Sequence, residues 1–195
     1  MSKKKRKNRF FYIDTNVAID FATNRDIQTV TVLEMIRGRG WKCVSSTFLA
    51  MEMADYKQDY VFIAKELNKQ RDPTDILRSR GNKNLGNAAF QEIEEWFKEF
   101  TQRFKNLTMY DFIHDANGWT LARDISFSSN ISAPDVLHLT SAILGSKAGY
   151  CDTLITKDGT FQKEAEKILT QLKLRTKLRV MSPSEVRRIF FPKMF

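Results

Sequence analysis

Four acidic residues are the strongest candidates for chemistry in this sequence: Asp14, Glu52, Asp135 and Asp158. Asp14 directly follows the apolar run at 10–13, and Asp158 closely follows the apolar run at 153–156. Taken singly, each carboxylate is explained as a helix cap, a turn residue or an exposed helix position. Taken together, two strand ends and two helix starts present carboxylates at the edge where α/β sheets carry their chemistry. Carboxylates that meet repel one another and need a cation, and Mg²⁺ or Mn²⁺ prefers an all-oxygen shell.

Short apolar runs that alternate with helical patterns must position these carboxylates. Strands are expected at 10–13, 41–45, 153–156 and 178–181. Helices are expected at 27–36, after Ser46 or Thr47, after the cap pair Asp72-Pro73, at 132–147, at 161–172 and after the capping box Ser182–Glu185. This order predicts an α/β fold with a small, mostly parallel central sheet and helices on both faces.

Length and composition restrict the class of protein. The chain has 195 residues, 42% of them hydrophobic, which suits one sizeable domain or one domain with an insertion. No apolar run is long enough for a membrane helix, and the N-terminus lacks the pattern of a secretory signal. Two cysteines are too few to staple a secreted fold, so we expect a cytoplasmic, reducing setting without membrane association.

The charge is basic overall but unevenly spread. The formal net charge is +9, and residues 3–9 carry six positive charges without an acid. A second basic stretch covers 163–188, whereas 10–64 and 106–162 are net acidic. This pattern suits an enzyme that attracts a polyanion and holds metal cations where it acts. The alternative is a solubilising basic arm with solvated helix faces.

Four sequence strings resemble, in order, the motifs of PIN domain ribonucleases: FYIDTNVAIDF, SSTFLAMEMADY, APDVLHLTSAI and DTLITKDGTF. They contain Asp14, Glu52, Asp135 and Asp158 respectively. Any one string is a weak signal, but four in order are fairly specific. The pattern is most similar to the VapC-like toxins of toxin–antitoxin pairs, which are metal-dependent RNA endonucleases. The resemblance therefore implies an RNA substrate and either a toxin, with an antitoxin protein as partner and a homodimer as its form, or an RNA-processing nuclease.

The resemblance also implies roles for single residues. The four acids would be the catalytic metal ligands for one or two Mg²⁺ or Mn²⁺ ions, which activate water for in-line attack on a phosphodiester. The products would carry a 5′-phosphate and a 3′-hydroxyl. Thr15, Asn16 and Thr156 would orient the carboxylates or water by hydrogen bonds.

The chain departs from compact VapC-like proteins by its extra length. We expect a basic flexible arm over 1–9 and a single PIN-like domain over 10–195, with a helical insertion at about 56–105. A basic loop at 78–87 makes Arg78, Arg80 and Lys83 candidates for RNA phosphate contacts, or simply surface charge. The insertion also repeats apolar residues at helical spacing over 90–104, which we interpret as core packing rather than as a base-stacking surface.

Other chemistries lack the necessary residues. The chain has two histidines, of which His138 lies one helical turn from Asp135 and is interpreted as a hydrogen-bonded helix residue. No zinc spacing, phosphate-binding loop or dinucleotide-binding motif is present. The main alternative is a catalytically silent PIN-like module that binds RNA or protein, and a DNA nuclease ranks below it.

Overall fold

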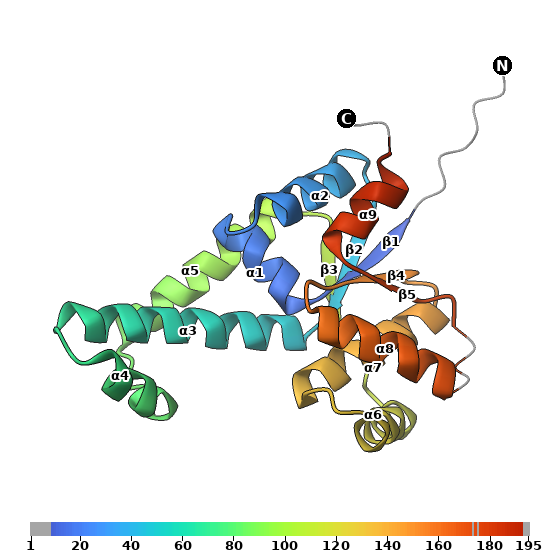
Figure 1. The fold of residues 1–195 in the computed structure, drawn as a ribbon. Helices are drawn as coiled ribbons and strands as arrows, with labels where there is room; N and C mark the ends of the chain where they lie inside the picture. Colours follow the sequence, from blue (N-terminus) through green and yellow to red (C-terminus); the bar gives the residue numbers. More distant parts are fainter. Residues whose placement is uncertain (1–8, 173, 175, 193–195) are drawn as a thin grey trace. The chain divides into compact units, whose positions relative to one another are not determined.

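A parallel sheet organises the chain in the computed structural model, which describes residues 9–172, 174 and 176–192. Within these residues the sheet has five strands in the order β3-β2-β1-β4-β5, every pair parallel (Figure 1). The strands are β1 (Phe10–Ile13), β2 (Lys42–Ser46), β3 (Leu107–Tyr110), β4 (Thr153–Ile155) and β5 (Arg179–Met181). The α/β class predicted from the sequence is confirmed, and the arrangement is consistent with a PIN-like fold.

The chain divides into two compact units, which are described separately. The first unit comprises 1–49 and 105–195 and contains the whole sheet. Its helices are α1 (Thr15–Thr23), α2 (Ile27–Gly38), α6 (Ala116–Ser128), α7 (Ala133–Lys147), α8 (Gly159–Gln171) and α9 (Pro183–Phe190). The second unit is Ala50–Phe104. It holds most of α3 (Phe48–Asn68), together with α4 (Pro73–Ser79), the 3₁₀ turn η1 (Arg80–Asn82) and α5 (Asn87–Arg103).

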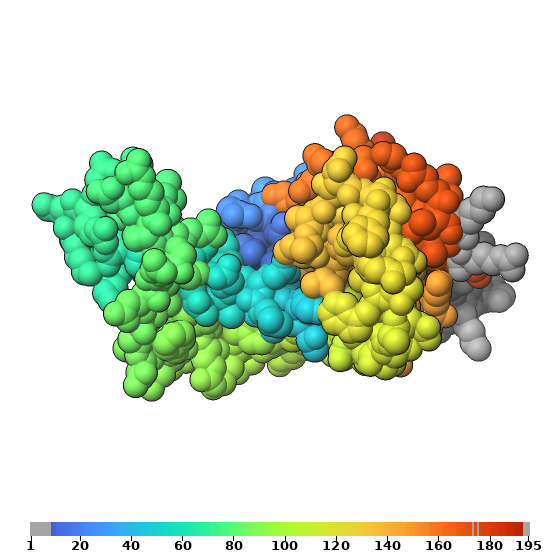
Figure 2. All heavy atoms as spheres, turned by 90° about the horizontal axis from the view of Figure 1, so that it is seen from below, coloured from blue at the N-terminus to red at the C-terminus, as the bar shows by residue number. Residues whose placement is uncertain are grey.

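Alternation along the strands gives the sheet of the first unit two apolar faces. One face carries Tyr12, Val44 and Leu154, which pack in one cluster with apolar side chains of α6, α7 and α8. These three helices form a continuous surface, coloured yellow to orange in Figure 2. The opposite face carries Phe11, whose ring lies 5.7 Å from that of Phe190 in α9. Helices therefore cover both faces of the sheet, as predicted.

The second unit is built from helices. Lys57 in α3 forms an ion pair with Glu92 in α5 at 2.8 Å, and the rings of Tyr56 and Trp96 lie 6.4 Å apart. The predicted insertion at about 56–105 covers most of this unit, and the predicted amphipathic helix is α5. Its buried side chains include Ile93 and Phe100, in line with the core-packing interpretation of its apolar face.

The structure corrects the sequence analysis at three places. The strand β3 and the helix α6 were not predicted, and the loop expected at 78–87 is shorter. Residues 78 and 79 complete α4, 80–82 form η1, and α5 begins at 87. The strand β3 is half-exposed, so it lacks a continuous apolar run. Helix α6 includes Gly118, a weak helix former, where a Cβ would lie 3.3 Å from Ile113 and Leu144 atoms, so close packing selects this glycine.

The predicted starts of two helices are confirmed. Asp72 caps α4 with Pro73 in its first turn, and Ser182 and Glu185 form the predicted capping box of α9. The predicted arm at 1–9 lies outside the described residues except for Arg9. Among the described helices, none is both long enough and apolar enough to cross a membrane.

Candidate active site

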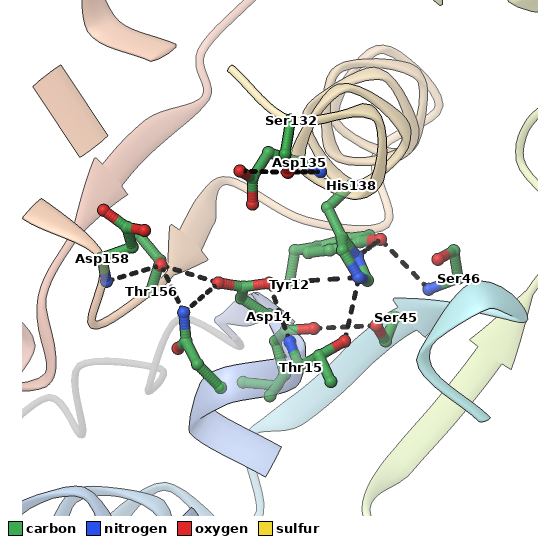
Figure 3. A network of polar contacts seen from close by, with 12 residues as sticks. Tyr12, Asp14, Thr15, Ser45, Ser46, Ser132, Asp135, His138, Thr156 and Asp158 are labelled. Atoms are coloured by element: carbon green, nitrogen blue, oxygen red, sulfur yellow. Dashed lines mark hydrogen bonds and ion pairs between the residues drawn. The ribbon is translucent and has the colours of Figure 1, made fainter. Parts of the chain in front are cut away.

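Asp14 lies at the carboxyl end of β1 and is the most buried of the four predicted carboxylates. It caps α1, and its Oδ1 accepts the backbone N–H of Thr15 at 2.8 Å. Its Oδ2 accepts hydrogen bonds from Asn16 Nδ2 at 2.6 Å and from the Thr156 hydroxyl at 2.7 Å (Figure 3). Only 3% of the residue is exposed, so these three donors replace the water that a free carboxylate would bind. Thr15, Asn16 and Thr156 therefore contact Asp14, while their roles in orienting ligands of a metal stay a prediction.

The Thr156 hydroxyl connects Asp14 to Asp158. It donates its single proton to Asp14 and accepts from Asn16 Nδ2 and from the backbone N–H of Asp158, both at 3.1 Å. Asp158 itself is exposed and caps α8, where its Oδ1 accepts two backbone N–H groups at 2.8 and 2.9 Å. These hydrogen bonds therefore hold the carboxyl end of β4 against the carboxyl end of β1.

Asp135 lies in the first turn of α7 and is half-buried. Its Oδ2 accepts the hydroxyl proton of Ser132 at 2.6 Å, while its backbone N–H donates to the same serine oxygen at 3.3 Å. Burial raises the pKa of the Asp14 carboxyl above its usual value, and the negative charge of Asp135 adds to this rise. The charge of His138 and the hydrogen bonds from Thr156 and Thr15 act in the opposite direction. The charge of Asp135 is thus a minor contribution to the raised pKa of Asp14 beside the effect of burial.

His138 is buried on α7 beside Asp14. Its Nδ1 lies 2.9 Å from the Tyr12 hydroxyl, and its Nε2 lies 3.0 Å from the Thr15 hydroxyl and 4.0 Å from Asp14 Oδ1. The Tyr12 oxygen also accepts the backbone N–H of Ser46 at 3.2 Å. The interpretation of His138 as a hydrogen-bonded helix histidine is confirmed, and its contacts join β1, α1 and α7 behind the Asp14 carboxylate.

Glu52 belongs to a different part of the chain. It lies on the second turn of α3, within the second compact unit, and is half-buried. Its role as a metal ligand is predicted by the sequence motif and stays a prediction.

The described side chains around Asp14 carry oxygen atoms of the kind that bind a hard cation, but they are not grouped closely enough to form a complete ligand set. Among residues 9–172, 174 and 176–192, no three His, Cys, Asp or Glu side chains are grouped so that they could hold one metal ion. Asp135 and Asp158 each hold one carboxylate oxygen on a local helix cap. The donors next to Asp14 are carboxylate and hydroxyl oxygens, which Mg²⁺ and Mn²⁺ prefer.

An ion-pair network that the sequence analysis missed supports the turn after β4. Lys157 lies between Thr156 and Asp158, and its Nζ contacts Asp20 at 2.5 Å and Asp26 at 2.8 Å. Asp20 is fully buried and also pairs with Arg25 at 2.6 Å. The signal for this network was an acid inside the apolar stretch of 17–21, because a buried carboxylate requires a partner.

The three predicted RNA contacts lie in the second unit and already have acidic neighbours. Lys83 pairs with Asp55 and Asp59, both at 2.7 Å, and its side chain is only 16% exposed. Arg80 also pairs with Asp59, whereas Arg78 is 78% exposed and lies 3.7 Å from Asp75. Of the three, Arg78 is thus the side chain most accessible to a phosphate.

Comparisons with known proteins give structural likeness but no match in sequence. No family model matches the chain, and no curated protein matches its sequence. A chain of the crystal structure of VapBC2 from Rickettsia felis bound to a DNA fragment from their promoter is similar, with a TM-score of 0.49. The two chains are 12% identical, and the match covers 89% of this chain and 98% of that chain. At this TM-score the likeness assigns neither family nor function, so the α/β class rests on the chain's own sheet.

The Lys157 network predicts a loss of stability in acid. The hydrogen bond from Lys157 lowers the pKa of Asp26 from 3.8 to about 2. A carboxyl whose pKa is lower in the folded state stabilises the fold above the unfolded pKa. We therefore expect this stabilisation to disappear as the pH falls from about 4 to about 2. Urea unfolding across this range should show a smaller acid dependence for Asp26→Asn, which keeps a helix-capping side chain. An equal acid dependence in both proteins would contradict the assignment.

Proposed function

We propose that the chain is a metal-dependent endoribonuclease whose centre is Asp14. The observation that carries the proposal is a buried carboxylate, with a raised pKa, at the carboxyl end of the central strand of a parallel sheet. Among the described residues, no lysine or arginine nitrogen lies within ion-pair distance of it, although Asp135 contributes a second negative charge. Burial makes the ionised form of Asp14 costly, and a bound cation would offset that cost, as expected of a site that takes one.

The residues around Asp14 would hold and orient the reacting groups. A Mg²⁺ or Mn²⁺ ion bound to Asp14 and Asp135 would lower the pKa of a water molecule and neutralise phosphodiester charge. Thr156 and Asn16 hold the Asp14 carboxylate in one orientation. Asp158 is exposed and caps α8 through one carboxylate oxygen, and its other oxygen would orient water or substrate. Attack on the phosphorus with departure of the 3′ oxygen leaves a 5′-phosphate and a 3′-hydroxyl.

The proposed substrate, biological role and partners rest on the sequence motifs. Their order along the chain supports an RNA substrate and a role as the toxin of a toxin–antitoxin pair, with an antitoxin protein and a second copy of the chain as partners. An RNA-processing nuclease has the same chemistry. The net charge of +9 supports a polyanionic substrate. On the same motif evidence we propose Glu52 as a further metal ligand.

One observation favours the alternative, a catalytically silent PIN-like module that binds RNA or protein. In the part of the chain that the structure describes, no three potential metal ligands come together. A module of this kind would bind RNA or its partner without cleaving RNA, and this binding would not depend on a divalent cation.

A metal-binding measurement separates the two functions. Because burial raises the pKa of Asp14, its ionised form destabilises the fold as the pH rises through that pKa. A cation that binds only the folded chain should offset this cost. At a hundred times its dissociation constant it would add about 2.7 kcal/mol, which raises the melting temperature by several degrees. We expect Mn²⁺ to raise the melting temperature of the wild-type protein but not of Asp14→Asn.

The cleavage assay completes the test. Structured and single-stranded RNA are incubated with Mg²⁺, with Mn²⁺ or with EDTA. Cleavage that requires the metal supports the nuclease. Absence of both a Mn²⁺-induced shift and any cleavage would replace it with the binding module.

A further inference from the structure

A cavity in the first unit lies over the starts of strands, away from the carboxyl end that carries Asp14. Its volume is about 470 Å³, within the usual range for small-ligand sites. The residues that matter for its chemistry are Phe10, Lys42, Lys105, Asn106, Tyr110 and Tyr150. The parallel register aligns Phe10 with Lys42 across β1 and β2. Strand alternation therefore places both on the sheet face that also carries Tyr12 and Val44.

The cavity is positively charged. Both Lys42 and Lys105 are exposed, and no acidic side chain is among the residues that line it. Within the described residues, neither ammonium group forms an ion pair. Two unpaired ammonium groups at one cavity attract an anion such as a phosphate.

One wall of the cavity is an aromatic ring held in place. The ring of Tyr150 lies 4.8 Å from that of Tyr110 and 5.9 Å from that of Phe112. Tyr150 nevertheless stays 42% exposed, because these two rings cover only part of it. A fixed, partly exposed ring is the surface on which nucleobases stack.

Asn106, one of the residues that line the cavity, carries a buried acceptor that lacks a donor. Asn106 Nδ2 lies 2.6 Å from the carbonyl oxygen of Trp41. Since a carbonyl oxygen only accepts hydrogen bonds, this contact fixes the amide orientation. The other amide atom, Asn106 Oδ1, is buried and has no hydrogen-bond partner in the described structure. A ligand N–H group that reaches this oxygen would satisfy it.

We propose that this cavity binds one nucleotide unit. Its phosphate contacts Lys42 and Lys105, its base stacks on Tyr150, and an exocyclic amino group of the base donates to Asn106 Oδ1. Adenine, cytosine and guanine carry such an amino group, whereas uracil does not, so uridine nucleotides should bind least tightly. The proposal is independent of the carboxylate site, because no residue of that site lines the cavity. The same chemistry is offered by a free nucleotide and by a nucleotide within an RNA strand.

The experiment is a calorimetric titration of the full chain in EDTA, which removes divalent cations. The probes are the four ribonucleoside 5′-monophosphates, the matching nucleosides and short oligoribonucleotides of A, C or U. We expect saturable binding of AMP, CMP or GMP at millimolar or lower concentration, with the nucleosides about tenfold weaker. Binding tighter for the oligonucleotide than for the monophosphate identifies an RNA strand as the source. Equal or weaker binding identifies a free nucleotide.

Variants with matched controls locate the binding. The double variant Lys42→Gln/Lys105→Gln and the variant Tyr150→Ala should each weaken binding by about tenfold or more. Tyr150→Phe, which keeps the ring, should bind like wild type. Lys163→Gln, an exposed lysine of α8, and Phe127→Ala, an aromatic on α6 that is 84% exposed, should have no effect. The proposal is overturned if no monophosphate or oligonucleotide binds, or if binding survives both cavity variants.

Discussion

Replacement of Asp14 by asparagine should abolish RNA cleavage while the protein stays folded. Asparagine has nearly the same shape and still caps α1 through its amide oxygen, but it cannot supply a charged ligand to a cation. A loss of at least about a hundredfold is expected, since even residues that only support metal ligands cost 10–100-fold. The uncharged side chain removes the desolvation cost that raises the Asp14 pKa but loses the hydrogen bonds that Oδ2 accepts from Asn16 and Thr156, and because these effects oppose each other the protein should stay folded at neutral pH. Cleavage rate and urea unfolding are measured on the same preparations.

The matched control for Asp14→Asn is Asp111→Asn, an exposed carboxylate of the first unit. This variant should cleave like wild type. Glu52→Gln tests the ligand that the sequence motifs add, and we expect a loss of the same order. Undiminished metal-dependent cleavage by Asp14→Asn would move the catalytic centre elsewhere. Loss of cleavage together with unfolding would reduce Asp14 to a structural cap.

Replacement of Lys157 by methionine should produce the largest loss of stability. Methionine keeps an unbranched side chain but leaves the fully buried Asp20 with Arg25 alone. Removing one partner of a buried ion pair costs about 3–5 kcal/mol. Because the Lys157 side chain is 35% exposed, we expect about 2–3 kcal/mol in the free energy of unfolding. Urea unfolding at neutral pH measures the change.

Two comparisons make the Lys157 result specific. Lys157→Arg keeps the charge and should recover most of the stability, whereas Lys163→Met removes an exposed lysine from α8 and should change it little. The double variant Lys157→Met/Asp26→Asn should be less destabilised than the sum of the single variants, because the two residues share one ion pair. Additive losses would show that the pair contributes nothing measurable.

The network also bears on the proposed reaction. Lys157 lies between Thr156 and Asp158, and its backbone N–H donates to Asn16 Oδ1 at 3.0 Å. The same turn therefore carries the hydrogen bond to Asp14 and the anchor to α1. The ion pair between Lys157 and the buried Asp20 therefore holds in place the turn that carries Thr156 and Asp158.

Local patterns in the sequence determined much of the fold. Apolar runs predicted four of the strands, and the caps at Asp72 and Ser182 predicted the starts of α4 and α9. The position of Asp14 at the end of β1 followed in the same way, because a strand that ends in a polar cap is visible within a few residues. The strand β3 and the helix α6 escaped, since their burial depends on neighbours distant in the sequence.

Only the tertiary structure decided which distant residues meet. Lys157 and Asp20 are 137 residues apart in the chain, and Tyr12 and His138 are 126 apart, yet each pair is in hydrogen-bond contact. The cavity beside Tyr150 likewise depends on the parallel register that aligns Phe10 with Lys42. Residue type and spacing record local periodicity and capping. The order and register of strands depend on how all the apolar faces are buried together, so these contacts appear only in the folded chain.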